Sequence, residues 1–192
     1  MKILGDADRD KAVDIFARAF HDDPVLNWIS PHPDFLSTFF QVTLPALIPS
    51  GLTYTDDTGM GAASWLGPGH KLEWPVTPGN LWRMLQVCGV RGFSRFAFSG
   101  LTTAKFHPGE PHYYLFLLGA VPEAQGKGIG SALISRVLRK CDEENVPAYL
   151  ENSKPDNLPF YQGHGFEVID KIHFAKNAPP VWLMWREPRP QL

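Results

Sequence analysis

The stretch LFLLGAVPEAQGKGIGSALISRVL, residues 115–138, decides the fold. It contains an apolar run, a polar loop with glycines at positions 126, 128 and 130, and a second run whose apolar residues recur every three or four positions. This order predicts a buried strand, a tight loop and an amphipathic helix over residues 129–144. Glycine has more backbone freedom to lose on folding than any other residue, so three of them indicate a loop that must keep its backbone bare.

A loop between a strand and a helix N-terminus is well suited to hold an anion. The first N–H groups of a helix lack intrahelical partners and lie at the positive end of the helix dipole. Glycines let a ligand approach these groups, while Lys127 adds a positive charge and Ser131 a hydroxyl. We therefore expect a phosphate or pyrophosphate here.

The spacing of the glycines excludes two common nucleotide loops. The dinucleotide pattern Gly-x-Gly-x-x-Gly fails because Ser131 stands where its third glycine belongs. A Walker loop fails because the chain has no Gly-Lys-Ser/Thr sequence. The pattern that remains is Gln-x-x-Gly-x-Gly, formed by Gln125, Gly128 and Gly130.

This loop resembles the coenzyme A loop of the GCN5-related N-acetyltransferase (GNAT) family, whose signature is Gln/Arg-x-x-Gly-x-Gly/Ala. The later stretch YLENSKPDNLPFYQGHGFEVID, residues 149–170, is similar to the family's next strand, its asparagine-bearing helix and the Gly-Phe that opens the following strand. The resemblance covers residues 112–170. It implies a GNAT-like α/β fold with a central mixed, splayed sheet flanked by helices, and we expect one domain over residues 1–192.

The resemblance also implies acetyl-CoA as the co-substrate, with no metal. In the family, the strand before the loop carries a bulge and diverges from the next strand, which makes a slot for the pantetheine arm. The residues carried over by position are Leu118, Gly119, Ala120 and Val121 for pantetheine, Gln125, Gly126, Lys127, Gly128, Ile129, Gly130 and Ser131 for the pyrophosphate, and Asn157, Phe160 and Tyr161 for the far side of the slot.

Acetyl transfer to an amine sets requirements that candidate residues have to meet. An alkyl ammonium, with a pKa of about 10.4, must lose a proton before it attacks. Tyr161 matches the family's usual general acid at the sulfur, and a backbone N–H near Ala120 is the expected donor to the oxyanion. Two residues are candidates for the base: Glu151, acting through a water, is ranked slightly above His112.

The predicted function is therefore transfer of an acetyl group from acetyl-CoA to a primary amine of a small molecule or peptide by direct attack. One alternative is a non-catalytic coenzyme A-binding module, which would keep residues 125–130 but lose the tyrosine. Another is a transferase of longer acyl chains, which would need a wider slot. The acceptor is not identified, because its pocket is expected from the N-terminal helices and residues 67–111.

The composition argues against several other classes of protein. A formal net charge of −2 without a basic stripe predicts no nucleic-acid partner. Cys88 and Cys141 have neither zinc spacing nor the number needed for a disulfide framework. No leader and no run of about 18 apolar residues is visible, so we expect a cytoplasmic protein without membrane contact. A homodimer is left open.

Weaker patterns predict the remaining elements. A first helix is expected over residues 6–20, and Asp23-Pro24 should prevent it from continuing. A second is expected within 33–48, with a kink or end at Pro45. A hairpin is expected over 52–66, and Trp65 at its end is a candidate to line the acceptor pocket. Residues 79–98 have broken helical character, and a loop is expected over 99–111. The C-terminal half adds strands at 112–121, 147–152, 166–175 and 181–187 and a helix near 156–163; the first two strands should be parallel and the last two a hairpin.

Overall fold

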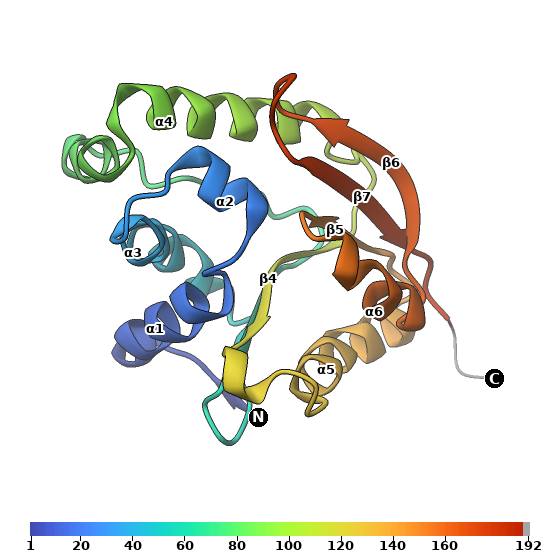
Figure 1. Ribbon diagram of the computed structural model, residues 1–192. Helices are drawn as coiled ribbons and strands as arrows, with labels where there is room; N and C mark the ends of the chain where they lie inside the picture. The colour runs from blue at the N-terminus through green and yellow to red at the C-terminus, as the bar shows by residue number, and fades with distance from the viewer. Residues whose placement is uncertain (190–192) are drawn as a thin grey trace.

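The computed structural model describes residues 1–189, which form a seven-stranded mixed sheet with helices on both faces (Figure 1). The strand order is β1-β2-β3-β4-β5-β7-β6. Neighbouring strands are antiparallel except β4 and β5, which are parallel as predicted. The strands are β1 (Lys2–Ile3), β2 (Thr53–Thr55), β3 (Gly61–Leu66), β4 (Tyr113–Ala120), β5 (Ala148–Asn152), β6 (Glu167–His173) and β7 (Pro180–Arg186).

Six α-helices flank this sheet in the described part of the chain. They are α1 (Arg9–Ala19), α2 (Pro24–Ile29), α3 (Phe35–Leu47), α4 (Pro78–Phe106), α5 (Ile129–Glu144) and α6 (Leu158–Gly163). Figure 1 shows α1, α2 and α3 on one side of β4 and α5 and α6 on the other. Each side has its own apolar core, and the two cores meet the opposite faces of the sheet. The predicted mixed α/β fold is confirmed.

Helix α5 has the predicted bounds, because its sequence pattern and its packing agree. Its buried residues are Leu133, Ile134, Val137, Leu138 and Cys141, which recur at helical spacing and face the core on that side of the sheet. The helix ends at Asn145, whose φ of 53° is the left-handed conformation that closes many helices. It connects the parallel strands β4 and β5.

The predicted loop over residues 99–111 is wrong, because α4 continues to Phe106. Of the two glycines taken as helix breaks, only Gly89 departs from helical geometry, with φ 60° and ψ 177°. Gly92 lies within the helix and is buried, and a Cβ there would stand 2.8 Å from the carbonyl oxygen of Ile29. Position 92 is thus a close contact between α4 and α2, and the glycine permits it.

The structure refines three other sequence expectations. Asp23-Pro24 does end the first helical segment, but Pro24 also begins α2, which the sequence did not reveal. Pro45 lies inside α3, and that helix runs on to Leu47. Trp65 is fully buried in the core beside α5, so it does not wall an acceptor pocket.

Candidate active site

The site begins where β4 and β5 separate. Their parallel register runs from Tyr113 opposite Ala148 to Leu115 opposite Leu150, although both strands continue further. On its other side, β4 has a bulge at residue 116, because Trp65 of β3 pairs with Leu115 while its neighbour Ser64 pairs with Leu117. The bulge and the divergence that the sequence resemblance implied are both present.

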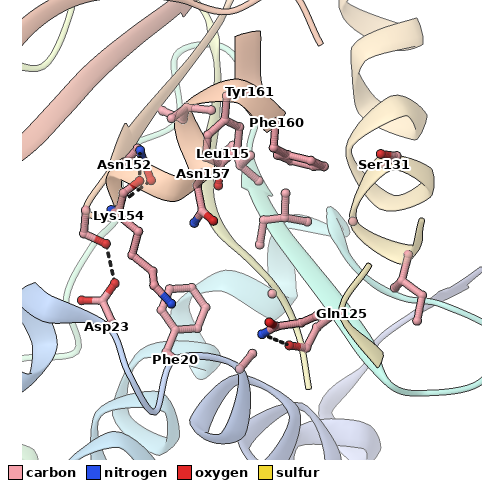
Figure 2. A pocket seen from close by; sticks show the side chains of 18 of the residues that line it. Phe20, Asp23, Leu115, Gln125, Ser131, Asn152, Lys154, Asn157, Phe160 and Tyr161 are labelled. Atoms are coloured by element: carbon pink, nitrogen blue, oxygen red, sulfur yellow. Dashed lines mark hydrogen bonds between the residues drawn. The ribbon is translucent and has the colours of Figure 1, made fainter. Parts of the chain in front are cut away.

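A cavity of about 500 Å³ opens in the gap between the diverging strands (Figure 2). Most of the predicted site residues line it: Leu118, Gly119, Ala120, Gln125, Gly126, Gly128, Ile129, Gly130, Ser131, Glu151, Asn157, Phe160 and Tyr161. The other predicted residues do not. Val121 is buried and donates its N–H to the Met60 carbonyl, Lys127 is exposed on the loop, and His112 is buried away from the cavity.

The glycine loop presents backbone to this cavity for identifiable reasons. Gly126 and Gly128 have φ of 73° and 79°, left-handed values that favour glycine. A Cβ on Gly130 would lie 3.3 Å from the ring of Phe160, so that position keeps α5 close to α6. The Ala132 N–H donates to the Gly128 carbonyl at 3.0 Å, and the N–H groups before it lie at the end of the helix that faces the cavity. The loop therefore forms a bare, positively polarised cradle.

The cavity passes through the sheet from one face to the other. Its lining on the side of α5 and α6 includes Ser131 and Phe160, whereas Phe20 and Asp22 belong to the segment at the end of α1 on the opposite side. Side chains alternate along β5, so Leu150 packs with the α5 core while Glu151 faces the other way. Residues from both faces of the sheet therefore meet around this cavity.

Tyr161 stands in this gap on α6, in an apolar setting. Only 8% of the residue is exposed, and its ring makes edge contacts with Phe160 and Phe166. Burial raises the pKa of its phenol, and the nearby carboxyl of Asp23 raises it further. The hydroxyl consequently keeps its proton at neutral pH, as a general acid must.

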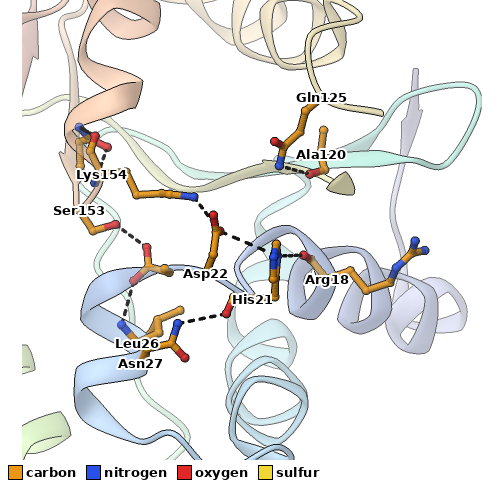
Figure 3. A network of polar contacts seen from close by, with 11 residues as sticks. Arg18, His21, Asp22, Leu26, Asn27, Ala120, Gln125, Ser153 and Lys154 are labelled. Atoms are coloured by element: carbon orange, nitrogen blue, oxygen red, sulfur yellow. Dashed lines mark hydrogen bonds and ion pairs between the residues drawn. The ribbon is translucent and has the colours of Figure 1, made fainter. Parts of the chain in front are cut away.

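A polar network joins the loop after α1 to the loop after β5 beside the cavity (Figure 3). Asp23 caps α2 by accepting from the Leu26 N–H at 2.8 Å, and its second oxygen accepts from the Ser153 hydroxyl. The Lys154 ammonium lies 2.6 Å from the Asp22 carboxylate. Burial raises the pKa of Asp23 despite these donors. Sequence reasoning missed this network, since its members have no motif.

Glu151 lies in the cavity with its carboxylate held by two phenols. Tyr114 donates to Oε2 at 2.8 Å and Tyr149 donates to Oε1 at 3.1 Å. The sequence did not reveal these donors, although alternation along β5 puts residues 149 and 151 on one face. His107 was also missed, because its segment was taken as a loop; its Nδ1 is 3.8 Å from Oε1 of Glu151.

His112, the other candidate base, has a different environment. Its Nδ1 is 2.6 Å from the Glu110 carbonyl oxygen, and its ring packs against Tyr149 and Trp185. Burial lowers the pKa of its imidazole. Of the two predicted bases, the structure brings only Glu151 to the cavity.

The described residues show neither a group of metal ligands nor a membrane-spanning helix. Within residues 1–189, no cluster of three or more His, Cys, Asp or Glu side chains is placed to hold a metal ion. Across the same residues, none of the helices combines the length and the apolar character needed to cross a membrane.

Known proteins are similar to this chain in sequence and in fold. Residues 87–166 match the profile of the acetyltransferase (GNAT) family. An uncharacterized N-acetyltransferase of Schizosaccharomyces pombe is 28% identical over 94% of this chain and 80% of its own. A GCN5-like protein acetyltransferase of Mycobacterium tuberculosis is 36% identical over 53% of this chain and 49% of its own.

A solved structure from Corynebacterium glutamicum, described as histone acetyltransferase HPA2 and related acetyltransferase, superimposes with a TM-score of 0.71. It is 24% identical, and the match covers 99% of this chain and 96% of that one, so it shows a shared fold. The family profile, the N-acetyltransferase relatives and this fold together support a GNAT-family protein with N-acetyltransferase activity in general.

Proposed function

We propose that the protein transfers an acetyl group from acetyl-CoA to a primary amine of a small molecule or peptide. The observation that carries this proposal is the cavity between the diverging strands, which has an anion cradle at one end and a carboxylate and a phenol in its middle. A cradle alone would serve any phosphate ligand. The cradle, the slot and the two titratable groups together match what acetyl transfer requires.

The residues present fit acetyl-CoA as the co-substrate. The left-handed glycines and the N-terminus of α5 suit its pyrophosphate, because they offer N–H groups without side chains in the way. The free edge of β4 from Leu118 to Ala120 offers backbone groups to the amides of pantetheine. When bound, this ligand supplies an acetyl thioester that an amine can attack.

The chain's own groups would then move two protons and hold one charge. Glu151 takes a proton from the acceptor ammonium, directly or through a water, so that the nitrogen lone pair becomes available. A backbone N–H near Ala120 donates to the carbonyl oxygen as charge builds there. The new C–N bond forms, the C–S bond breaks, and the Tyr161 hydroxyl gives its proton to the departing sulfur. The proton lost from the new amide nitrogen balances the one that Tyr161 gave.

A non-catalytic coenzyme A-binding module is the second candidate. It would need the glycine cradle but not a protonated phenol or a carboxylate inside the cavity. Tyr161 and Glu151 both line that cavity, from opposite walls, which favours turnover. A transferase of longer acyl chains would share the whole arrangement, and the acyl donor tested separates it from an acetyltransferase.

A panel of amines tests the proposal, with release of coenzyme A followed by a thiol reagent. The panel should contain polyamines, amino acids, aminoglycosides and peptides with a free lysine, each with acetyl-CoA and with a longer acyl-CoA. We expect release with acetyl-CoA that depends on at least one amine, and mass spectrometry should find that amine heavier by one acetyl group. Binding of acetyl-CoA without acetylation of any amine would favour the binding module.

A further inference from the structure

Four aromatic side chains and one carboxylate gather beyond the C-terminal end of α4, and the proposed chemistry uses only the carboxylate. The cluster consists of His107, His112, Tyr114, Tyr149 and Glu151. Glu151 is the member that lines the cavity. The others lie outside the cavity lining: His107 directly follows α4, His112 directly precedes β4, and Tyr114 and Tyr149 belong to β4 and β5.

His107 occupies a particular place in this cluster. Its ring lies 4.8 Å from the ring of Tyr114 and 5.1 Å from that of Tyr149, the two phenols that donate to Glu151. Its Nδ1 is 3.8 Å from Oε1 of Glu151, which is ion-pair distance when the imidazole is protonated. The His107 side chain is 27% exposed and the Glu151 side chain 15%, so the imidazole is the more open of the two to solvent.

The contacts of the two histidines differ. His112 is 7% exposed and its Nδ1 is held by the Glu110 carbonyl, so that nitrogen is occupied. His107 places its Nδ1 toward the Glu151 carboxylate. An imidazole between a partly buried carboxylate and water is suited to carry protons outward.

We propose that His107 acts through Glu151, as the group that receives the proton taken from the acceptor amine and passes it to solvent. This inference rests on the proposed function and extends it. His107 is a positioning residue in this scheme, since it touches the carboxylate and neither of the reacting ligands.

The proton balance of the step is simple. One N–H bond of the acceptor ammonium breaks, and its electron pair stays on nitrogen. The proton goes to the Glu151 carboxylate, then through one bridging water across the 3.8 Å gap to the free ring nitrogen of neutral His107, and finally to solvent. Glu151 returns to its charged form, in which Tyr114 and Tyr149 donate to it. The turnover of one ammonium and one thioester thus yields an amide, a thiol and one released proton.

The experiment uses the full chain and an amine that the panel identifies. Two variants are compared with the wild type: His107→Ala, which leaves space for a small molecule, and His107→Gln, which keeps hydrogen bonding but cannot take up a proton. His173→Gln, at an exposed position of β6 outside the cavity lining, is the matched control. Glu151→Gln removes the group through which His107 acts. Acetyl-CoA affinity is measured for each by calorimetry, so that a folding or cofactor defect is visible.

We expect both His107 variants to lose about tenfold or more in kcat/KM, with acetyl-CoA affinity within a few-fold of the wild type. Added imidazole should restore the activity of His107→Ala, and the rescue should grow between pH of about 6 and 8 as imidazole becomes neutral. Pyrazole, a ring of the same size and a far weaker base, should not restore it. Glu151→Gln should lose activity that imidazole does not restore, and His173→Gln should keep its activity.

Three results would overturn the inference. If His107→Gln keeps wild-type kcat/KM from pH 6 to 9 while Glu151→Gln does not, the function stands and the relay is wrong. If the loss in His107→Ala is unaffected by imidazole, or is restored equally by pyrazole, His107 only packs against its neighbours. If the wild type binds acetyl-CoA but acetylates no amine, the proposed function fails and this inference fails with it.

Discussion

Leu115 of β4 and Leu150 of β5 form the last pair between the two strands, and the glycine loop and α6, which line the cavity, follow one or the other of them in the chain. Before this pair the strands are held together by a parallel ladder and by two apolar cores. After it they separate around the cavity. The site is therefore formed by the divergence of the two strands, and the paired, packed part of the sheet supports it.

The hydroxyl of Tyr161 can be tested without disturbing its packing. We expect Tyr161→Phe to lower kcat by about 10²-fold or more, because the ring stays in place and only the proton donor is lost. Acetyl-CoA affinity should stay within a few-fold. Tyr113→Phe is a matched control, since that buried phenol donates to Glu144 at 2.6 Å and does not line the cavity. Full kcat in Tyr161→Phe, with chemistry limiting the rate, would make Tyr161 a packing residue.

The cradle should be sensitive to a side chain at Gly128. A Cβ there would meet no atom within 4 Å, but a valine has to adopt a φ of 79°, which costs on the order of 1–2 kcal/mol or distorts the loop. We expect Gly128→Val to weaken acetyl-CoA binding and to shrink the rise in Tm that saturating acetyl-CoA produces.

Gly79→Val provides the comparison for this change. A Cβ on Gly79 would also meet no atom within 4 Å, but the φ of this residue lies outside the left-handed region and it does not belong to the cavity lining. Acetyl-CoA affinity should be preserved in that variant. Equal affinity in the Gly128 and Gly79 variants, by calorimetry, would move the pyrophosphate elsewhere.

The buried carboxyl of Asp23 should make stability depend on pH. Because burial raises its folded pKa above the usual 3.8, the folded state binds the proton more tightly than the unfolded chain. The stability that this provides is complete below pH 3.8 and is lost as pH rises through the folded pKa. Asp23→Asn keeps a good N-cap and cannot ionise. Its free energy of unfolding should therefore improve relative to the wild type between pH 3.8 and neutrality.

Denaturant unfolding at a series of pH values measures this effect. A difference between Asp23→Asn and the wild type that stays constant over the whole range would mean that Asp23 does not ionise with a raised pKa. The Ser153 hydroxyl, which now donates to Asp23, can instead accept from the asparagine amide, so the contact between the two loops is retained.

A sheltered ion pair fastens α5 to β7 behind the site. The Arg186 guanidinium donates to both oxygens of Asp142, at 2.7 and 2.9 Å, and its side chain is only 5% exposed. We expect Asp142→Ala to lower the free energy of unfolding by about 3 kcal/mol, since it leaves a buried charge without its partner. Asp6→Ala, which breaks the exposed pair with Arg9, should cost about 1 kcal/mol or less in urea unfolding. Similar losses in the two variants would contradict this account.

The sequence predicted those parts of the fold whose signals are local. The bounds of α5 and the parallel pairing of β4 with β5 followed from an apolar period and a glycine loop. The two-residue strand β1 has no such signal, and α2 was hidden because Asp23-Pro24 both ends one segment and starts the next. Gly92 was misread for a physical reason: a glycine that breaks a helix and a glycine that lets two helices touch look alike in one sequence.

In the candidate site, too, the sequence predicts the features that depend on neighbouring residues and misses the contacts between distant ones. The cradle residues were predictable, because left-handed glycines and a helix N-terminus act within a few positions of one another. The link from Asp23 to Ser153 spans 130 positions, and the pair of His107 and Glu151 joins the residue after α4 to β5. Such contacts depend on how elements that are distant in the chain pack together, so no sequence motif predicts them.

The separation of β4 from β5 gives this sheet an edge in its interior. Unpaired strand edges invite pairing with other chains, and proteins usually blunt or cover those at the margin of a sheet. This edge lies within a cavity of about 500 Å³, which is too small to admit a sheet from another molecule. A slender ligand with amide groups can enter and complete the hydrogen bonding that the strands leave open. Such a ligand would pair with β4 as a short additional strand does, and the amide protons of β4 beyond Leu115 would then exchange more slowly with solvent.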